Sequence, residues 1–140
     1  MNLGNFPNLV REGYTVASPA DPYYNCIAWA ADDHLYWWWP GHTDCYWPNT
    51  VPEEDTEAAF VLAFESIGYV ECDGPDFEIG FDKVALYSAD DGTIEHAAKQ
   101  VGPDQWSSKI GENEDILHTL EGLEGPLYGT VKHYMKRPTT

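Results

Sequence analysis

The order of segments along the 140-residue chain predicts an α+β fold. Helix-favouring segments come first, near residues 26–31 and 58–67, and strand-like segments follow them. Asp90-Asp91-Gly92 and Gly102-Pro103-Asp104 supply turns between consecutive strand-like segments, so we expect an antiparallel meander. Because 43% of the residues are hydrophobic, the chain can bury a sizeable core, and we expect a single domain over residues 1–140.

The first half is expected to hold an arm and two helices. Residues 1–20 are broken by glycine and proline and predict an irregular N-terminal arm. Asp21 or Asn25 is a candidate cap for a helix that begins near Cys26. Acidic residues at 53–57 suit the positive end of a second helix, in which large apolar residues recur at spacings of four and three.

The second half is expected to form most of the sheet. The predicted strands span 69–72, 83–88, 94–101, 105–110 and 127–134, with a short helix over 114–123. We therefore expect the helix that carries Cys26 to pack on an antiparallel sheet of about four to five strands.

Residues 36–52, YWWWPGHTDCYWPNTVP, are too rich in Trp, Pro and Gly for a regular element. They predict an aromatic loop packed on the core, and the same rings are candidates for a ligand wall. The candidate substrate-binding residues are Tyr24, Trp37, Trp38, Trp47 and Trp106.

Charge restricts the partners. Seven Lys and Arg against 24 Asp and Glu give a net charge of −17. A surface this acidic is repelled by phosphate backbones and anionic lipid, so we expect neither nucleic-acid nor membrane binding. A basic protein partner or an amine-bearing substrate fits the charge. The sequence contains no signal peptide and no apolar run of membrane-spanning length, so we expect a reduced, cytoplasmic protein.

Cys26 and His96 are the candidate reactive pair. The predicted helix start would favour the Cys26 thiolate, because the positive end of the helix dipole stabilises an anion. His96 lies within a predicted strand, and its small neighbours Ala97 and Ala98 leave room beside the imidazole ring. A packed core thiol and a hydrogen-bonded core histidine are the structural alternative.

Cysteine at a helix start, histidine on a later strand, and a next strand that begins with Trp106 resembles the papain-like and transglutaminase-like cysteine superfamily. This resemblance covers residues 21–111. It implies a papain-like arrangement with Cys26 as nucleophile and His96 as base. Where that superfamily usually has Asn or Asp as third residue, this chain offers Ser108, whose hydroxyl would orient His96.

A second resemblance spans most of the chain. The strings YNCIAWA at 24–30, WWWP at 37–40, YWP at 46–48, HAAKQ at 96–100, WSSKIG at 106–111 and DILH at 115–118 resemble a family of uncharacterised bacterial proteins. That resemblance implies a common fold and supplies no activity.

Other chemistry is less well supported. Cys26, His34, His42 and Cys45 supply zinc-type ligands, but their spacing has no C-x2-C knuckle, and we predict no metal and no cofactor. His118 and His133 are expected to be capping or exposed residues on the last helix and the last strand. Two functions remain open: a small cysteine hydrolase or acyl transferase acting on an amide, thioester or ester, and a non-enzymatic acidic binding protein of the immunity, antitoxin or anti-defence type.

Overall fold

The computed structural model describes residues 3–110 and 114–139. Its helices are the 3-10 helix η1 (Leu3–Asn5) and the α-helices α1 (Pro7–Glu12), α2 (Cys26–Ala30), α3 (Glu57–Glu65) and α4 (Leu120–Leu123). Its strands are β1 (Thr15–Ser18), β2 (Val70–Cys72), β3 (Phe81–Ser88), β4 (Ile94–Gly102), β5 (Gln105–Lys109), β6 (Asp115–His118) and β7 (Thr130–Pro138). No helix among these described residues is both long and apolar enough to cross a membrane.

All seven strands join one sheet in the order β1-β6-β5-β4-β3-β7-β2, and each neighbouring pair is antiparallel. The α+β class is therefore confirmed. Strands β3, β4 and β5 form the expected meander, whereas β2, which was expected beside β3, pairs with β7. The sheet has seven strands where the sequence predicted four or five. The difference lies mainly in β1 and β6, two segments for which we expected other structure.

Strand β6 occupies the first part of the predicted helix over 114–123, so that prediction is wrong. Asp115–His118 pairs with β5 on one side and β1 on the other. The helix α4 begins only after Thr119, whose hydroxyl accepts a hydrogen bond from the Gly122 amide at 3.2 Å. A capping threonine at this point marks a helix start, so the boundary was readable from the sequence.

The predicted irregular arm is also wrong over most of its length. Pro7 occupies the first turn of α1, and Gly13 ends that helix with φ at +84°. This placement follows the usual preference for proline at helix starts and glycine just past helix ends. The following residues form the edge strand β1, and residues 1–2 lie outside the described part of the arm.

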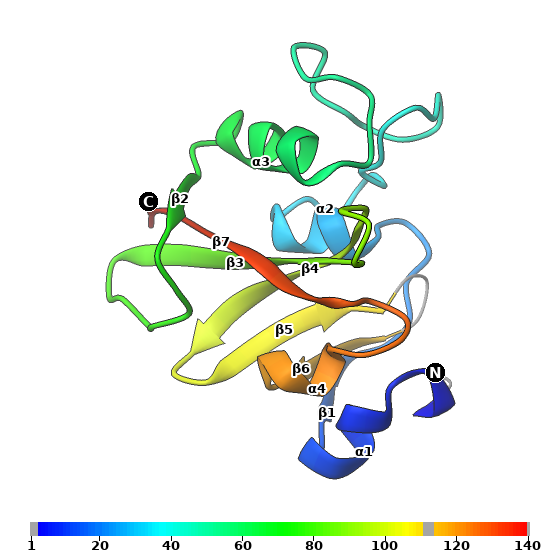
Figure 1. Cartoon of the computed structure of the whole chain (residues 1–140), viewed down its shortest axis with the longest axis vertical. Helices are drawn as coiled ribbons and strands as arrows, with labels where there is room; N and C mark the ends of the chain where they lie inside the picture. Colours follow the sequence, from blue (N-terminus) through cyan, green and yellow to red (C-terminus); the bar gives the residue numbers. More distant parts are fainter. Residues whose placement is uncertain (1–2, 111–113, 140) are drawn as a thin grey trace.

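Two cores cover the two faces of the sheet. On β3, Val84 and Leu86 point to the core beneath α2 and α3, whereas Ala85 and Tyr87 point to the core beside α1 and α4. Figure 1 shows these two pairs of helices on opposite sides of the sheet. Helix α2 and strand β4 are in contact, so Cys26 lies next to the centre of the sheet.

Residues 36–52 form the expected irregular aromatic loop. A single bridge joins Trp38 to Tyr46, and the rings of Trp39 and Trp47 meet Phe60 of α3 edge-on, with centroids 5.3 and 5.0 Å away. The loop is therefore fixed against the core that also holds α2.

Candidate functional site

Asn25 fixes the start of the helix that carries Cys26. Its side-chain oxygen accepts hydrogen bonds from the amides of Ala28 and Trp38, both at 3.1 Å. Its side-chain nitrogen donates to the Trp38 carbonyl at 3.0 Å. One buried amide therefore caps α2 and joins it to the aromatic loop, which places Cys26 as the first residue of the helix.

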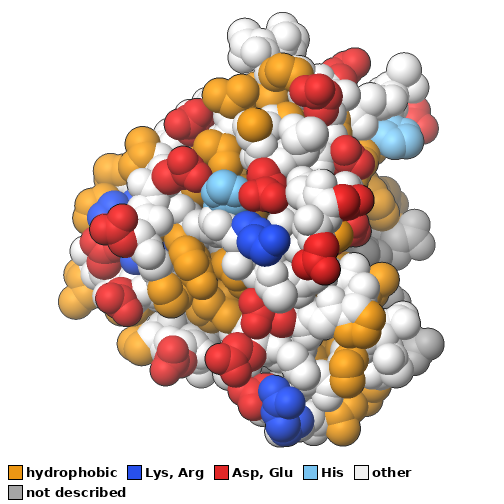
Figure 2. Space-filling view, viewed as in Figure 1, with side chains coloured by type: hydrophobic (Ala, Val, Ile, Leu, Met, Phe, Trp, Pro, Cys, Tyr) orange, Lys and Arg blue, Asp and Glu red, His pale blue; other side chains and the backbone are white. Residues whose placement is uncertain are grey.

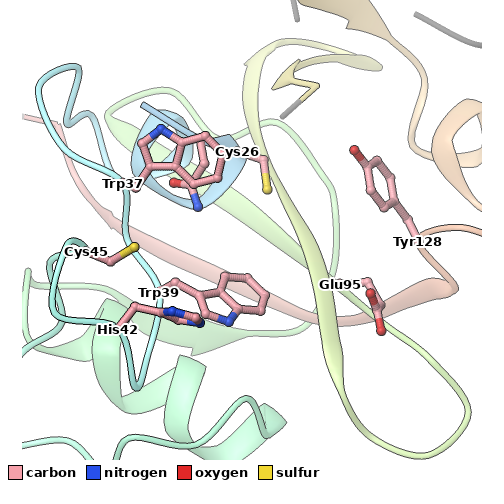
Figure 3. A pocket seen from close by; sticks show the side chains of 8 residues that line it. Cys26, Trp37, Trp39, His42, Cys45, Glu95 and Tyr128 are labelled. Atoms are coloured by element: carbon pink, nitrogen blue, oxygen red, sulfur yellow. The ribbon is translucent and has the colours of Figure 1, made fainter. Parts of the chain in front are cut away.

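The Cys26 thiol lines a cavity of about 470 Å³ between α2, the aromatic loop and the start of β4 (Figure 3). Three large aromatic side chains line it: Trp37, Trp39 and Tyr128. The polar lining residues are Asn25, His42, Cys45 and Glu95. Figure 3 shows Cys26 facing the space between Trp39 and Tyr128, so a ligand in the cavity would contact the thiol.

The thiol is protonated at neutral pH. Cys26 is only 8% exposed, and burial raises its pKa to about 11. The backbone amides of Ala97, Ile27 and Cys26 and the charge of Lys109 favour the thiolate but offset only part of that shift. The expectation that the helix start would favour the thiolate is therefore wrong for the resting protein, because desolvation outweighs the helix amides.

His96 belongs to a buried chain of hydrogen bonds across three strands. Its Nε2 lies 2.9 Å from the Ser108 hydroxyl, which lies 2.7 Å from Nε2 of His118. Nδ1 of His118 lies 2.6 Å from the Thr119 carbonyl. The sequence reasoning proposed the Ser108 contact but placed His118 on a helix, so the second imidazole was missed.

The Thr119 carbonyl at the end of this row of hydrogen bonds determines which atom carries each proton. A carbonyl only accepts, so Nδ1 of His118 carries the proton; burial lowers the pKa of that ring to about 4, which leaves its Nε2 bare. Ser108 must then donate to His118 and accept from Nε2 of His96. Burial, with a further contribution from His118, holds the pKa of His96 well below its usual value. Nδ1 of His96 is therefore an unprotonated acceptor.

This Nδ1 atom is buried and has no hydrogen-bond partner in the part of the chain that the structure describes. The His96 ring stacks on Tyr128, with centroids 4.1 Å apart and planes 9° from parallel. Tyr128 also lines the cavity beside Cys26, so one phenol ring borders both candidate residues. Among the described residues, no hydrogen bond joins the Cys26 thiol to His96.

Strand β4 separates the two side chains in part. Cys26 belongs to the core beneath α2, whereas His96 packs against Tyr87 on the other face. The ladder between β3 and β4 shifts register here: Tyr87 pairs with His96 and Ser88 with Ile94. Glu95 is the extra residue of this bulge, and it lines the cavity. Bulges re-aim side chains in this way and are frequent beside active sites.

Of the five candidate substrate-binding residues, Trp37 lines the cavity. The other four lie elsewhere: Tyr24 stacks on Trp29, Trp38 donates to Asp33, Trp47 donates to the Pro52 carbonyl, and Trp106 is buried in the opposite core. Trp39 was proposed only as one ring of the aromatic loop, and Glu95 and Tyr128 were not proposed from the sequence, because a bulge and loop geometry, not periodicity, bring them to the cavity.

The four candidate zinc ligands do not gather. His42 and Cys45 line the cavity with Cys26, but His34 stacks on Trp29, with centroids 5.0 Å apart. In the described part of the chain, no group of three His, Cys, Asp or Glu residues is arranged to hold a metal ion.

Comparison with known proteins identifies a family of unknown function. Residues 15–136 match the family described as a domain of unknown function, DUF7689, and the chain belongs to that family. No curated protein and no solved structure matches the chain. The function therefore has to be argued from the site itself.

Proposed function

We propose that the chain is a small cysteine hydrolase or acyl transferase, with Cys26 as nucleophile, His96 as general base and Ser108 as the group that orients His96. The observation that carries this proposal is the Nδ1 atom of His96. It is a buried base to which no described residue donates, held in one tautomer, beside the phenol ring that also borders the cavity thiol. A thiol is the donor that this arrangement lacks.

The arrangement of elements is compatible with a papain-like enzyme. The cysteine begins a helix that packs on the sheet, the histidine lies on the strand that contacts this helix, and the third residue lies on the next strand. The thiol meets the backbone of β4 at Ala97, two residues after the bulge at Glu95. The proposal requires the thiol to turn past this bulge and reach Nδ1 when substrate binds; such contacts tighten in the substrate complex of many enzymes.

The proposed reaction starts from a neutral Cys26 thiol and a neutral His96 imidazole. As Sγ attacks the carbonyl carbon of an ester, thioester or amide, its proton moves to Nδ1 of His96, and the backbone N–H of Cys26 donates to the oxyanion. Nδ1 then returns the proton to the leaving group as the acyl thioester forms. Water, in a hydrolase, or an amine or alcohol, in a transferase, attacks the thioester, gives a proton to His96 and regenerates the thiol.

Acetylation by p-nitrophenyl acetate tests this proposal. We expect one acetyl group on Cys26 by peptide mass spectrometry, with a matching release of nitrophenol. His96→Gln should slow the acetylation by about a hundredfold, the lower end of what general-base catalysis contributes. Cys45→Ser is the matched control, because Cys45 lines the same cavity and has no part in the proposed step. Equal acetylation rates in the wild type and His96→Gln would overturn the proposal.

A second candidate function is the acidic binding protein. Figure 2 shows acidic side chains spread over one face with few basic ones between them. Several of the bases already pair internally, Lys83 and Lys136 with Glu78, and Arg137 with Asp32. If Cys26 resists acetylation, binding of a basic protein that weakens as salt is raised would support this candidate.

A further inference from the structure

The cavity beside Cys26 has an apolar aromatic wall and a single acidic side chain. Trp37, Trp39 and Tyr128 present rings to it, and Glu95 is the one acid among the described residues that line it. None of those lining side chains is a Lys or Arg. Glu95 forms no ion pair with another described residue, so its negative charge is uncompensated within the site.

The surroundings of Glu95 reinforce this charge. Burial raises the pKa of Glu95, and the negative charges of Asp91 and Asp55 raise it further. The charge part of this shift means that Asp91 and Asp55 repel the Glu95 carboxylate, so a cation bound beside Glu95 in the cavity would offset that repulsion. Neither Asp91 nor Asp55 has an ion pair with another described residue.

The rings are held in place before any ligand arrives. The Trp37 indole donates from Nε1 to the Pro22 carbonyl at 2.7 Å. Trp39 rests edge-on against Phe60, and Tyr128 stacks on His96. Fixed rings keep their electron-rich faces available without the entropy cost of ordering them. The chain already uses this interaction internally, since the Lys99 ammonium lies 3.9 Å from the centre of the Trp29 ring.

We infer that this cavity binds an organic ammonium group, seated between the aromatic wall and Glu95. Rings and a carboxylate around an apolar space are the chemistry that recognises alkylammonium groups. The inference deepens the proposed function and rests on it in one respect: the acyl substrate of Cys26 would carry its positive charge a few bonds away from the reacting carbonyl. The binding of the ammonium group itself requires no catalysis.

Charge-selective thiol reagents test this inference at Cys26 itself. In a Cys45→Ser, Cys72→Ser background, three methanethiosulfonates of similar reactivity are compared: the trimethylammonium-ethyl reagent, the sulfonatoethyl reagent and the neutral methyl reagent. Each rate, followed by intact mass, is divided by the rate with a small free thiol. We expect the cationic reagent to modify Cys26 at least tenfold faster than the anionic one. Because all three consume the same thiolate, the raised pKa of Cys26 cancels from the ratio.

Glu95→Gln should lower the advantage of the cationic reagent about fivefold, as removal of one nearby charge in a partly solvated site predicts. Glu65→Gln is the matched control: it removes the same charge from an exposed site on α3 and should leave the ratio unchanged. Choline should slow modification of Cys26 by the neutral reagent, and sodium chloride at equal ionic strength should not.

The outcomes separate the two proposals. Equal rates for the cationic and anionic reagents, or equal effects of the Glu95 and Glu65 variants, would overturn the ammonium site. Cation preference without acetylation by p-nitrophenyl acetate would leave the ammonium site standing and remove the enzyme. Acetylation that depends on His96, without a preference for the cationic reagent, would support the enzyme and overturn the ammonium site.

Discussion

Replacing Ser108 by alanine tests how much the buried hydrogen bonds from His96 to His118 contribute to stability. The hydroxyl accepts from His96 at 2.9 Å and donates to His118 at 2.7 Å, and Ser108 is fully buried. Its loss leaves an N–H and a bare ring nitrogen unpaired in the core. At about 1–3 kcal/mol for each unsatisfied buried group, we expect a loss of about 3 kcal/mol in the free energy of unfolding. For a chain of this size, that lowers Tm by about 9 °C.

Ser107→Ala is the matched control on the same strand. Ser107 points to the opposite face and accepts one hydrogen bond, from Nε1 of Trp29 at 3.0 Å. Its replacement should cost about 1 kcal/mol. Urea unfolding followed by tryptophan fluorescence measures both variants. Equal losses would refute the claim that Ser108 is the centre of a buried chain.

The same pair of variants has a readout at the imidazole rings. Nitrogen chemical shifts should show His96 protonated at Nε2 and bare at Nδ1 in the wild type and in Ser107→Ala. Ser108→Ala removes the acceptor that selects this tautomer, so the two forms should mix. A wild-type His96 protonated at Nδ1 would contradict the proton assignment and, with it, the role of His96 as base.

Two further predictions concern stability. The His118 ring is neutral in the folded state, with a pKa of about 4, and takes a proton in the unfolded state, where its pKa is 6.5. The free energy of unfolding should therefore fall by about 3 kcal/mol as pH falls from 6.5 to 4. Urea unfolding across that range should show a shallower loss in His118→Gln, and parallel profiles for the two proteins would contradict the buried neutral ring. Gly129→Ala should lower the free energy of unfolding by about 3 kcal/mol. The backbone angle φ is +76°, and an added Cβ would lie 2.6 Å from the Ser88 carbonyl carbon. The backbone would have to shift, which would break the paired hydrogen bonds between Gly129 and Gly125. Gly41→Ala has the same backbone angle, φ +77°, with open space around the Cβ, so it should cost only about 1 kcal/mol; equal losses in thermal unfolding would show that the Ser88 contact relaxes freely.

Local signals predicted most of the sheet and the helix that carries Cys26. Asn25 caps that helix as a short polar side chain at a helix start is expected to, and Phe60 and Phe64 bury the predicted face of α3. The failures have a common cause. Strand β6 is four residues long, and Asp115, Ile116 and His118 are all buried, so it lacks the alternation that identifies a strand. Its structure comes from β5 and β1 on either side, which lie far apart in the sequence.

The same limit applied to the site. Ser108 could be proposed because it lies on the strand after His96, a relation that the order of strands preserves. His118 could not, because its segment was assigned to a helix. Glu95 enters the cavity through a bulge and Tyr128 through a loop closed by Gly125 and Gly129. Neither position follows from residue spacing, since both depend on contacts between distant segments.

Two incomplete interactions of the described residues lie at the cavity that Cys26 lines or next to it. Away from the cavity, two carboxylates each pair with two bases: Glu78 holds both Lys83 and Lys136, and Asp32 holds both Lys99 and Arg137. At the cavity or next to it, and among the described residues, the Nδ1 atom of His96 has no donor and the carboxylate of Glu95 has no ion pair. Each costs stability that an apolar side chain of similar size would not. In the reaction and binding that we propose, a ligand with a carbonyl and an ammonium group would complete both, because attack on the carbonyl would move the thiol proton to the imidazole while the ammonium pairs with the carboxylate.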